Sequence, residues 1–483
     1  LIETEEQINY LINRQYKEAF IEIIPFHNNV HPALNDVSLV YFKPSIENKG
    51  FMLCITHSEC LGVSKTLVDE LLTQVDKLWV RDKKSALFYF QIKALLDSSI
   101  LIPPYIQEQT QAHNVLYQKY PNKKDINKII PIVKHYEVCE KIYETISPVF
   151  EKELPPYFRF YNEYTTLAFF GIEKNGIHIN KEIFDQHFKP NNPIYSISDD
   201  KIYTNFNLFT TTKRPSNSYN GINFAALNKD SGARESFVPQ NDKFVEIDIS
   251  AYHPNLAAHL VDYEFGVDDV HQAFADMYGV DYKKAKELTF KQLYGGIFKE
   301  YEHLEFFQKV KRYIDDNWRK FNEDGYVEVL RSGYWLEKSK LDNMNPQKLF
   351  NYVLQNLETA TNVCILIEIN KLLRGKKSKI VLYTYDSFLF DIKYLKIKNY
   401  KQKQVMEQHT TSNTTLTSTP HMYTSRYDFD QNINTVDVNN KLFCTFVNEV
   451  DIDSMVENVS KSYDIMYNKM FVLFIKSTGE YVI

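Results

Sequence analysis

The feature that most constrains this chain is an acidic residue inside a strongly apolar run. Residues 380–392 are apolar around one central interruption, Asp386-Ser387, and this pattern predicts a β-hairpin with Asp386 at its tip. An unpaired carboxylate is costly to bury in such surroundings. Asp386 therefore either makes the turn together with Ser387 or binds a metal ion.

A second acidic residue stands near the end of a predicted strand. Residues 244–249 alternate, so that Val245 and Ile247 face one side of the strand and Asp248 faces the other. If the two segments are neighbours, Asp248 and Asp386 can hold two divalent cations a few ångströms apart. Such a pair activates an attacking hydroxyl and stabilises a leaving pyrophosphate.

The segment between the two aspartates contains a predicted helix over residues 282–295. Lys286, Phe290 and Tyr294 recur every four residues and form one stripe of that helix. The lysine can meet a nucleoside triphosphate, the phenylalanine can pack on its base and sugar, and the tyrosine can stack at the templating position. Such a stripe is more often the face of an ordinary amphipathic helix.

In order and spacing, these motifs resemble the family A DNA polymerases, typified by bacterial DNA polymerase I. The likeness covers about residues 156–483, with its main motifs at 248–255, 282–295 and 385–387. It implies an α/β chain with an α+β palm and the fingers of a right-hand polymerase. An RNase H-like α/β domain of the exonuclease type would precede them.

The resemblance also implies a role for each matching residue. The catalytic residues would be Asp248, Asp386 and Lys286. Two Mg²⁺ ions, with Mn²⁺ as a substitute, would be held by Asp248, Ile249 and Asp386. The incoming nucleotide would contact His253, His271, Lys283, Lys286, Phe290 and Tyr294. The DNA would contact Arg214, Asn223, Asn351, Gln355 and Tyr385.

The chain departs from the family pattern at several of these positions. His253 replaces the glutamate that gates against ribose, and we hypothesise that it hydrogen-bonds the Tyr294 hydroxyl and still blocks a 2′-OH. Tyr282 replaces the arginine of the fingers, so Lys283 or Lys284 would serve the triphosphate. In the hairpin, Tyr385 and Ser387 replace a histidine and a glutamate, which leaves Asp391 as a candidate accessory carboxylate.

The resemblance divides the chain into four parts. We expect a degenerate 3′–5′ exonuclease-like domain at 1–155, the first part of the palm at 156–250, fingers at 251–345, and the second part of the palm at 346–483, with an insertion near 395–440. The family's thumb would be vestigial near 181–205, because this stretch is too short for a pair of long helices.

The first domain lacks the acidic residues that its position in the family would require. Exonuclease chemistry needs several carboxylates around two metal ions. The best matches are Glu22 on the first candidate strand and Glu140, while the second motif position, at 81–86, lacks its Phe-Asp pair. We therefore expect a domain that is exonuclease-like in fold but inactive.

Composition narrows the choice less than the motifs do. A net charge of −6 argues against a general polyanion binder, although lysines and arginines gather in short groups such as 283–286 and 309–312. The five cysteines have no CxxC spacing and suggest no disulfide framework. These features, with no apolar run long enough to cross a bilayer, predict a cytoplasmic setting. The resemblance to the polymerase family implies the cytoplasm of a bacterium or of a phage-infected host.

The sequence therefore predicts a DNA-dependent DNA polymerase that extends a primer with dNTPs and does not proofread. Its partners would be primer-template DNA, dNTPs and a processivity or replisome protein, and no membrane. Two other interpretations stay open. The chain could be an enzyme like the single-subunit RNA polymerases, since His253 replaces the gating glutamate, or a retired polymerase kept as a DNA-binding subunit.

Overall fold

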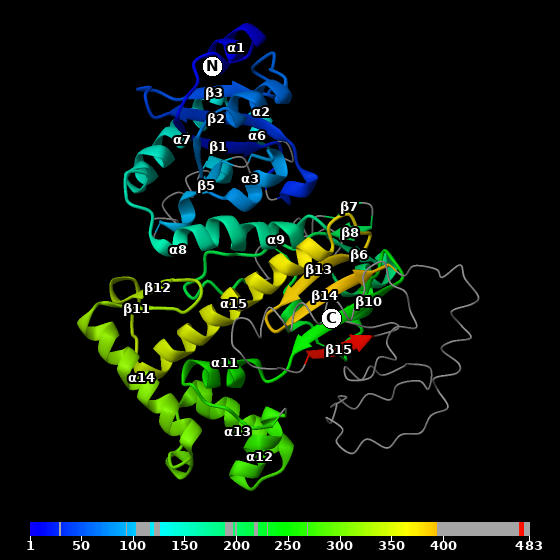
Figure 1. Ribbon diagram of the computed structural model, residues 1–483. Coiled ribbons are helices and arrows are strands. Elements are labelled where there is room, and N and C mark those ends of the chain that lie inside the picture. The colour runs from blue at the N-terminus through cyan, green and yellow to red at the C-terminus, as the bar shows by residue number, and fades with distance from the viewer. Residues whose placement is uncertain are drawn as a thin grey trace, which may run out of the picture. The chain divides into compact units, whose positions relative to one another are not determined.

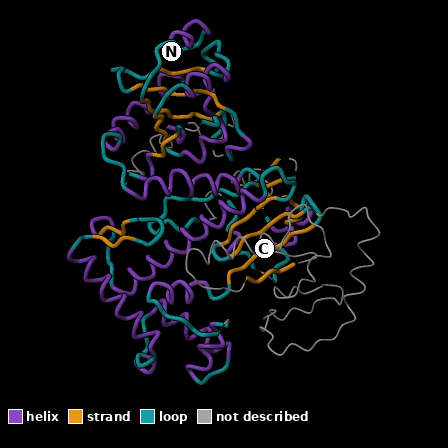
Figure 2. Tube along the Cα trace, in the orientation of Figure 1, coloured by secondary structure: helices purple, strands orange, loops and turns teal. Residues whose placement is uncertain are grey.

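The computed structural model describes residues 1–28, 30–92, 94–102, 116–119, 126–188, 197–198, 200–216, 221–228, 230–267, 269–393 and 473–477. The chain divides into two compact units, the first made of residues 1–176 and 189–223, and the second of 177–188 and 224–483. Figures 1 and 2 show the elements of each. The sequence pattern at 453–468 predicts a helix, and this stretch, like the insertion expected near 395–440, lies outside the described residues.

Unit 1 is built on a five-stranded mixed sheet of order β3-β2-β1-β4-β5 (Figure 1). Strand β1 is antiparallel to β2 and parallel to β4. The strands are β1 (Glu18–Pro25), β2 (Val37–Pro44), β3 (Phe51–Cys54), β4 (Lys77–Val80) and β5 (Leu95–Asp97). The helices and the remaining two short strands are α1 (Glu5–Ile12), α2 (Lys65–Thr73), α3 (Lys83–Tyr89), α6 (Ile126–Ile129), α7 (Ile132–Ile146), α8 (Pro156–Arg159), α9 (Thr166–Glu173), β7 (Ile197–Ser198) and β8 (Lys201–Ile202).

Apolar side chains cover both faces of this sheet. Helices α1 and α2 contribute residues such as Leu11 and Leu71 to the core on one face. On the other face the rings of Phe20 and Trp79 stack on Phe150, which follows α7. The sequence suggested no disulfide, but Cys54 and Cys60 are joined by one. The chain turns back after β3, and this turn brings the two cysteines together.

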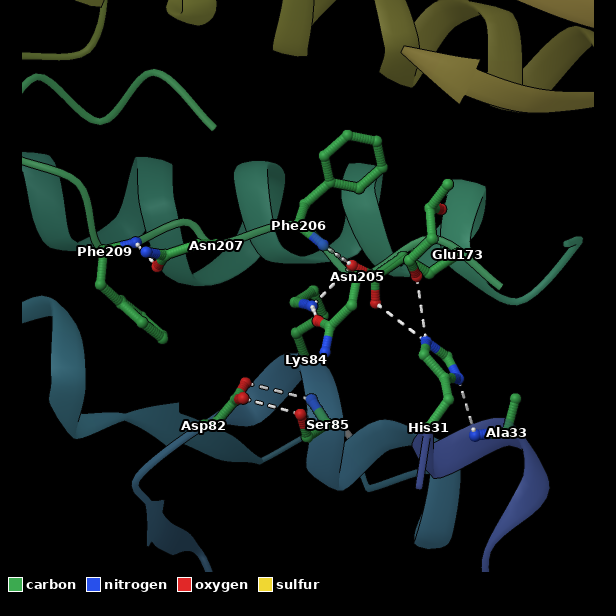
Figure 3. A network of polar contacts seen from close by, with 11 residues as sticks. His31, Ala33, Asp82, Lys84, Ser85, Glu173, Asn205, Phe206, Asn207 and Phe209 are labelled. Carbon is green, nitrogen blue, oxygen red and sulfur yellow. Dashed lines mark hydrogen bonds and ion pairs between the residues drawn. The ribbon is translucent and has the colours of Figure 1, made fainter. Parts of the chain in front are cut away.

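Unit 1 contains a buried polar cluster (Figure 3). It joins residues 204–206 to the part of the unit that carries the five-stranded sheet. The Glu173 carboxylate, at the end of α9, accepts hydrogen bonds from Lys84 Nζ at 2.6 Å and from the Phe206 backbone N–H at 2.5 Å. His31 Nε2 donates to the Thr204 carbonyl at 3.0 Å, since its Nδ1 already accepts from the backbone. Burial and the nearby Lys84 lower the pKa of His31 to about 3, so the imidazole is neutral.

Unit 2 is built on a second sheet of order β13-β14-β10-β15, with its helices grouped beside it (Figure 1). The strands are β6 (Ile177–Ile179), β9 (Phe237–Val238), β10 (Lys243–Ile249), β11 (Tyr326–Glu328), β12 (Trp335–Glu337), β13 (Lys379–Thr384), β14 (Ser387–Ile392) and β15 (Leu473–Ser477). The helices are α10 (Lys181–His187), α11 (Tyr252–Leu260), α12 (Val270–Tyr278), α13 (Tyr282–Gly295), α14 (Glu305–Glu323) and α15 (Pro346–Leu372). The long α15 packs against α11, α13 and α14.

The elements that carry the predicted motifs form where hydrophobic periodicity places them. Strand β10 matches the alternating segment 244–249, and β13 and β14 form the predicted hairpin. In the described part of residues 181–205, the longest helix is α10, with seven residues. None of the described helices is long and apolar enough to span a membrane.

Candidate active site

Asp248 and Asp386 lie at the same end of two hydrogen-bonded neighbouring strands. Strand β10 is antiparallel to β14, with Asp248 opposite Ser387. The backbone N–H of Ile249 donates to the carbonyl of Asp386 at 2.9 Å. Asp248 is half-buried and Asp386 is exposed. The two aspartates are 138 positions apart in the sequence (386 − 248). The pairing of the strands brings them to one edge of the sheet.

The hairpin turn consists of Tyr385 and Asp386, so the tip lies one residue before the predicted Asp386-Ser387 pair. Tyr385 has a φ of 65°, in the left-handed region that few non-glycine residues adopt. Such a conformation persists when its surroundings fix it. Here the fixing group is Asn362 of α15, whose Nδ2 donates to the Tyr385 carbonyl at 2.6 Å.

Sequence reasoning did not identify Asn362. Its side chain is completely buried, and it also donates to the Tyr383 hydroxyl at 3.0 Å and accepts from the Tyr252 hydroxyl at 2.8 Å. Tyr252 begins α11, four residues after Asp248. Asn362 therefore connects the start of α11, which follows Asp248, with the hairpin residues that precede Asp386. The sequence around Asn362, with Glu358, Thr359 and Thr361 close by, gives no local signal for this role.

The oxygen donors at this edge suit a divalent cation such as Mg²⁺, which prefers carboxylate and carbonyl ligands. Asp248 and Asp386 would supply carboxylates and Ile249 a carbonyl. Within the described ranges, no group of three or more histidine, cysteine, aspartate or glutamate side chains could hold a metal ion. Among the described residues, the ligands available at this edge are the two aspartates and the Ile249 carbonyl.

Asp391 does not serve as an accessory carboxylate, contrary to expectation. It is buried, and its two oxygens accept hydrogen bonds from the backbone N–H groups of Gln240 and Asn241, each at 2.9 Å. These bonds hold the turn before β10 against β14. Asp391 lies five residues beyond Asp386, on a buried strand. This position explains why its carboxylate binds backbone groups of the fold.

Helix α13 presents the predicted stripe away from its packed side. Ala285, Thr289 and Leu293 are buried, whereas Lys286 and Tyr294 are exposed. The rings of Phe290 and Tyr294 lie parallel, with centroids 6.0 Å apart and planes 2° apart. The exposed stripe therefore combines one cation with two stacked aromatic rings.

His271 is buried beside this stripe and is not a source of positive charge. Its ring lies 5.8 Å from that of Tyr282 and 6.1 Å from that of Phe290, measured between centroids. Burial and the neighbouring Lys286 lower the pKa of His271 to about 4. The predicted contact of His271 with the incoming nucleotide stays a prediction. Its imidazole is neutral at neutral pH.

His253 makes the hydrogen bond that its position suggested. Its Nδ1 lies 2.6 Å from the Tyr294 hydroxyl, which joins the start of α11 to the end of α13. On the other side, its Nε2 lies 3.2 Å from a carboxylate oxygen of Glu358 on α15. Glu358 is almost fully buried and was not recognised in the sequence.

The remaining candidate residues lie at different depths. Asn351 Nδ2 donates to the Tyr294 carbonyl at 3.0 Å, which caps α13. Gln355 is half-buried on α15, and Lys283 is exposed on α13. Arg214 is half-buried and Asn223 is exposed, and both belong to unit 1.

Comparisons with known proteins bear on the fold. No protein-family model matches the chain, and no curated protein matches it. Among solved structures, it is similar to the POL domain of Pol1 from M. smegmatis, which was determined in complex with DNA primer-template and dNTP. The TM-score is 0.62 at 11% identity, over 99% of this chain and 98% of that one. The chain therefore has a fold like that of this POL domain.

Proposed function

We propose that the protein is a template-directed DNA polymerase that extends a primer with dNTPs. The observation that carries this proposal is the position of Asp248 and Asp386 at one edge of a sheet, on hydrogen-bonded neighbouring strands. The likeness to a polymerase domain solved with primer-template and dNTP supports it. So does the exposed Lys-Phe-Tyr stripe of α13 in the same unit.

In this proposal Asp248, Asp386 and the Ile249 carbonyl hold two Mg²⁺ ions, for which Mn²⁺ can substitute. When bound, these ions supply Lewis-acid activation of the primer 3′-hydroxyl and stabilise the departing pyrophosphate. The role of the two aspartates is to bind the ions and to orient them toward the primer 3′-hydroxyl. Asn362 keeps the Asp386 turn in its left-handed conformation through the Tyr385 carbonyl.

Helix α13 receives the incoming nucleotide. Lys286, together with Lys283, places positive charge where the triphosphate binds, and the Lys286 ammonium can donate a proton to the leaving group. Phe290 packs on the base and sugar, and Tyr294 stacks at the templating position. The neutral His271 acts as a hydrogen-bonding group for the phosphates.

The remaining contacts are with DNA and with the sugar. Asn351, Gln355 and Tyr385 face the primer terminus, and Arg214 and Asn223 contact the DNA from unit 1. His253, bound to the Tyr294 hydroxyl, excludes a 2′-OH in place of the family's glutamate. On this basis dNTPs are preferred to NTPs.

Unit 1, in this proposal, is an exonuclease-like domain without exonuclease activity. Its sheet order, with β2 antiparallel to β1, suits that fold. Its candidate acids have other partners. Glu22 is in a two-pronged ion pair with Arg81, and Glu140 accepts the Gly50 N–H at 3.0 Å. A carboxylate neutralised by arginine is a poor metal ligand.

Primer extension with Mg²⁺ tests the proposal. We expect the unaltered protein to add dNTPs to a primer annealed to a template, and Asp248→Asn and Asp386→Asn to abolish the reaction. Asp316→Asn, which changes an exposed carboxylate on α14, serves as the matched control and should extend normally. Without dNTPs, a 3′-labelled primer should stay intact.

Each other outcome selects a different function. Extension with NTPs in place of dNTPs would indicate an RNA polymerase. Binding to primer-template with no extension by either nucleotide class, in Mg²⁺ or Mn²⁺, would indicate a retired subunit and would overturn the proposal. Shortening of the labelled primer would overturn the inactive assignment of unit 1.

A further inference from the structure

Glu358 forms the inner end of a buried chain of three side chains. Its carboxylate lies 3.2 Å from His253 Nε2, and His253 Nδ1 lies 2.6 Å from the Tyr294 hydroxyl. Glu358 is 1% exposed and His253 is 5% exposed, whereas Tyr294 is 38% exposed. The chain therefore runs from the packed interior of unit 2 to the exposed stripe of α13.

The chemistry of the three groups sets the direction of both contacts. Glu358 presents an acceptor oxygen 3.2 Å from Nε2, without the alignment of a hydrogen bond, and this oxygen favours the imidazole hydrogen on Nε2. Nδ1 then carries a lone pair and can only accept. The Tyr294 hydroxyl consequently donates its hydrogen to His253, and its oxygen keeps its lone pairs toward the exposed side.

The backbone around Glu358 keeps this carboxylate in place. The Tyr252 hydroxyl donates to the Glu358 carbonyl at 3.3 Å and to Asn362 one turn later. Tyr252 precedes His253 directly, so α11 and α15 are joined at the level of the His253–Glu358 contact. Neither partner can rotate away without breaking a buried polar contact, which is costly.

We propose that Glu358 is a positioning residue for sugar selection: it fixes the tautomer of His253 and thereby holds Tyr294 in place. This inference rests on the proposed polymerase function. Glu358 touches no substrate. Its effect reaches the nucleotide through His253 and Tyr294. A buried polar contact that served stability alone would not need the third member of the chain to be exposed on α13.

The tautomer can be measured without any catalytic assay. In protein labelled with ¹⁵N-histidine, NMR should show His253 protonated on Nε2 alone. Glu358→Gln, which can either donate or accept, should give a mixture of tautomers. Tyr294→Phe should leave the Nε2 tautomer unchanged, because Glu358 sets it. A His253 protonated on Nδ1 in the unaltered protein would overturn the inference and leave the proposed function intact.

Selectivity is the second readout. We expect Glu358→Gln to lower the ratio of kcat/KM for dGTP over GTP, opposite a template cytosine, by about tenfold, the size of one hydrogen bond of ordinary strength. Glu368→Gln, the same change at an exposed site of α15, should leave the ratio unchanged. Glu358→Gln should have no further effect when added to His253→Ala.

Two results would overturn the inference. One is an unchanged dGTP/GTP ratio in a folded Glu358→Gln protein whose His253 tautomer is mixed. The other is a dGTP/GTP ratio that falls as much when Glu358→Gln is added to His253→Ala as when it is made in the unaltered protein. If Glu358→Gln does not fold, Tyr294→Phe carries the test from the exposed end, where it should lower the ratio and keep the tautomer.

Discussion

His271 shows how burial changes what a single residue can do. Its side chain is 3% exposed, lies beside the rings of Tyr282 and Phe290, and is close to the Lys286 charge. Both burial and Lys286 disfavour a second proton on the ring. The folded protein therefore keeps His271 neutral at pH values where the unfolded chain protonates it.

This difference predicts a loss of stability in mild acid. The pKa of His271 is lowered to about 4 from 6.5, so its contribution is complete above pH 6.5 and is lost as the pH falls from 6.5 toward 4. Between pH 7.5 and 5.5 we expect the free energy of unfolding to drop by about 1 kcal/mol more in the unaltered protein than in His271→Gln. Urea unfolding at the two pH values measures this, and equal drops would contradict it.

At the residue scale, sequence reasoning found the groups that face solvent and missed those that support them. Asp248, Asp386, Lys286 and Tyr294 stand out because each breaks or repeats a local pattern. Asn362 and Glu358 act across long sequence distances, on the Tyr385 turn and on His253. Their partners are decided by how α15 packs, which no local pattern specifies.

Among the elements, helix α15 should control the geometry of the hairpin turn. Replacing Asn362 by leucine removes its bonds to the Tyr385 carbonyl, the Tyr383 hydroxyl and the Tyr252 hydroxyl. We expect kcat for primer extension to fall strongly with little change in KM for dNTPs, and stability to fall by about 1–3 kcal/mol. Single-turnover extension and urea unfolding measure the two effects.

A matched control separates the turn from general damage to the helix. Asn370→Leu changes a half-buried asparagine two turns further along α15 and should leave kcat unchanged. An Asn362→Leu protein that lost stability and kept its kcat would show that the Tyr385 conformation does not depend on this bond.

Elements with a strong hydrophobic period were predictable, and those shaped by packing were not. The alternation in 244–249 predicted β10, which buries every other residue over 245–249, and the apolar run in 380–392 predicted the β13–β14 hairpin, whose strands are buried on both faces. The pattern of residues 161–175 predicts a single amphipathic helix, and the helix that forms there is less regular. It begins with a π-helical segment, Phe160–Thr165, before α9. Periodicity does not reveal an extra residue in a helical turn.

For the molecule as a whole, the expectation that the thumb is vestigial predicts weak retention of DNA by the proposed polymerase. The described part of residues 181–205 offers no helix longer than α10 to grip a duplex backbone. With few phosphate contacts, each binding event should add only a few nucleotides, and extension should decline as salt rises. Extension in the presence of a heparin trap, at low and at physiological salt, measures both. Long products from one binding event would contradict the prediction.

The overall architecture was predictable only from the ordered set of motifs. Composition and net charge fit many proteins, whereas Asp248, the α13 stripe and Asp386 in this order predicted a polymerase-like fold, which the structural comparison supports. The disulfide between Cys54 and Cys60 was not predictable, since it depends on how the loop after β3 returns.

The polar cluster around Glu173 limits how the chain can be divided into stable fragments. Its members come from the sheet domain and from residues 204–206, and between them in the sequence lies α10, which belongs to unit 2. A fragment that stops at Gly176 would keep the Lys84–Glu173 pair and lose the Phe206 N–H and Asn205 that complete it. The two units are interleaved along the chain, so a single cut cannot yield either one whole.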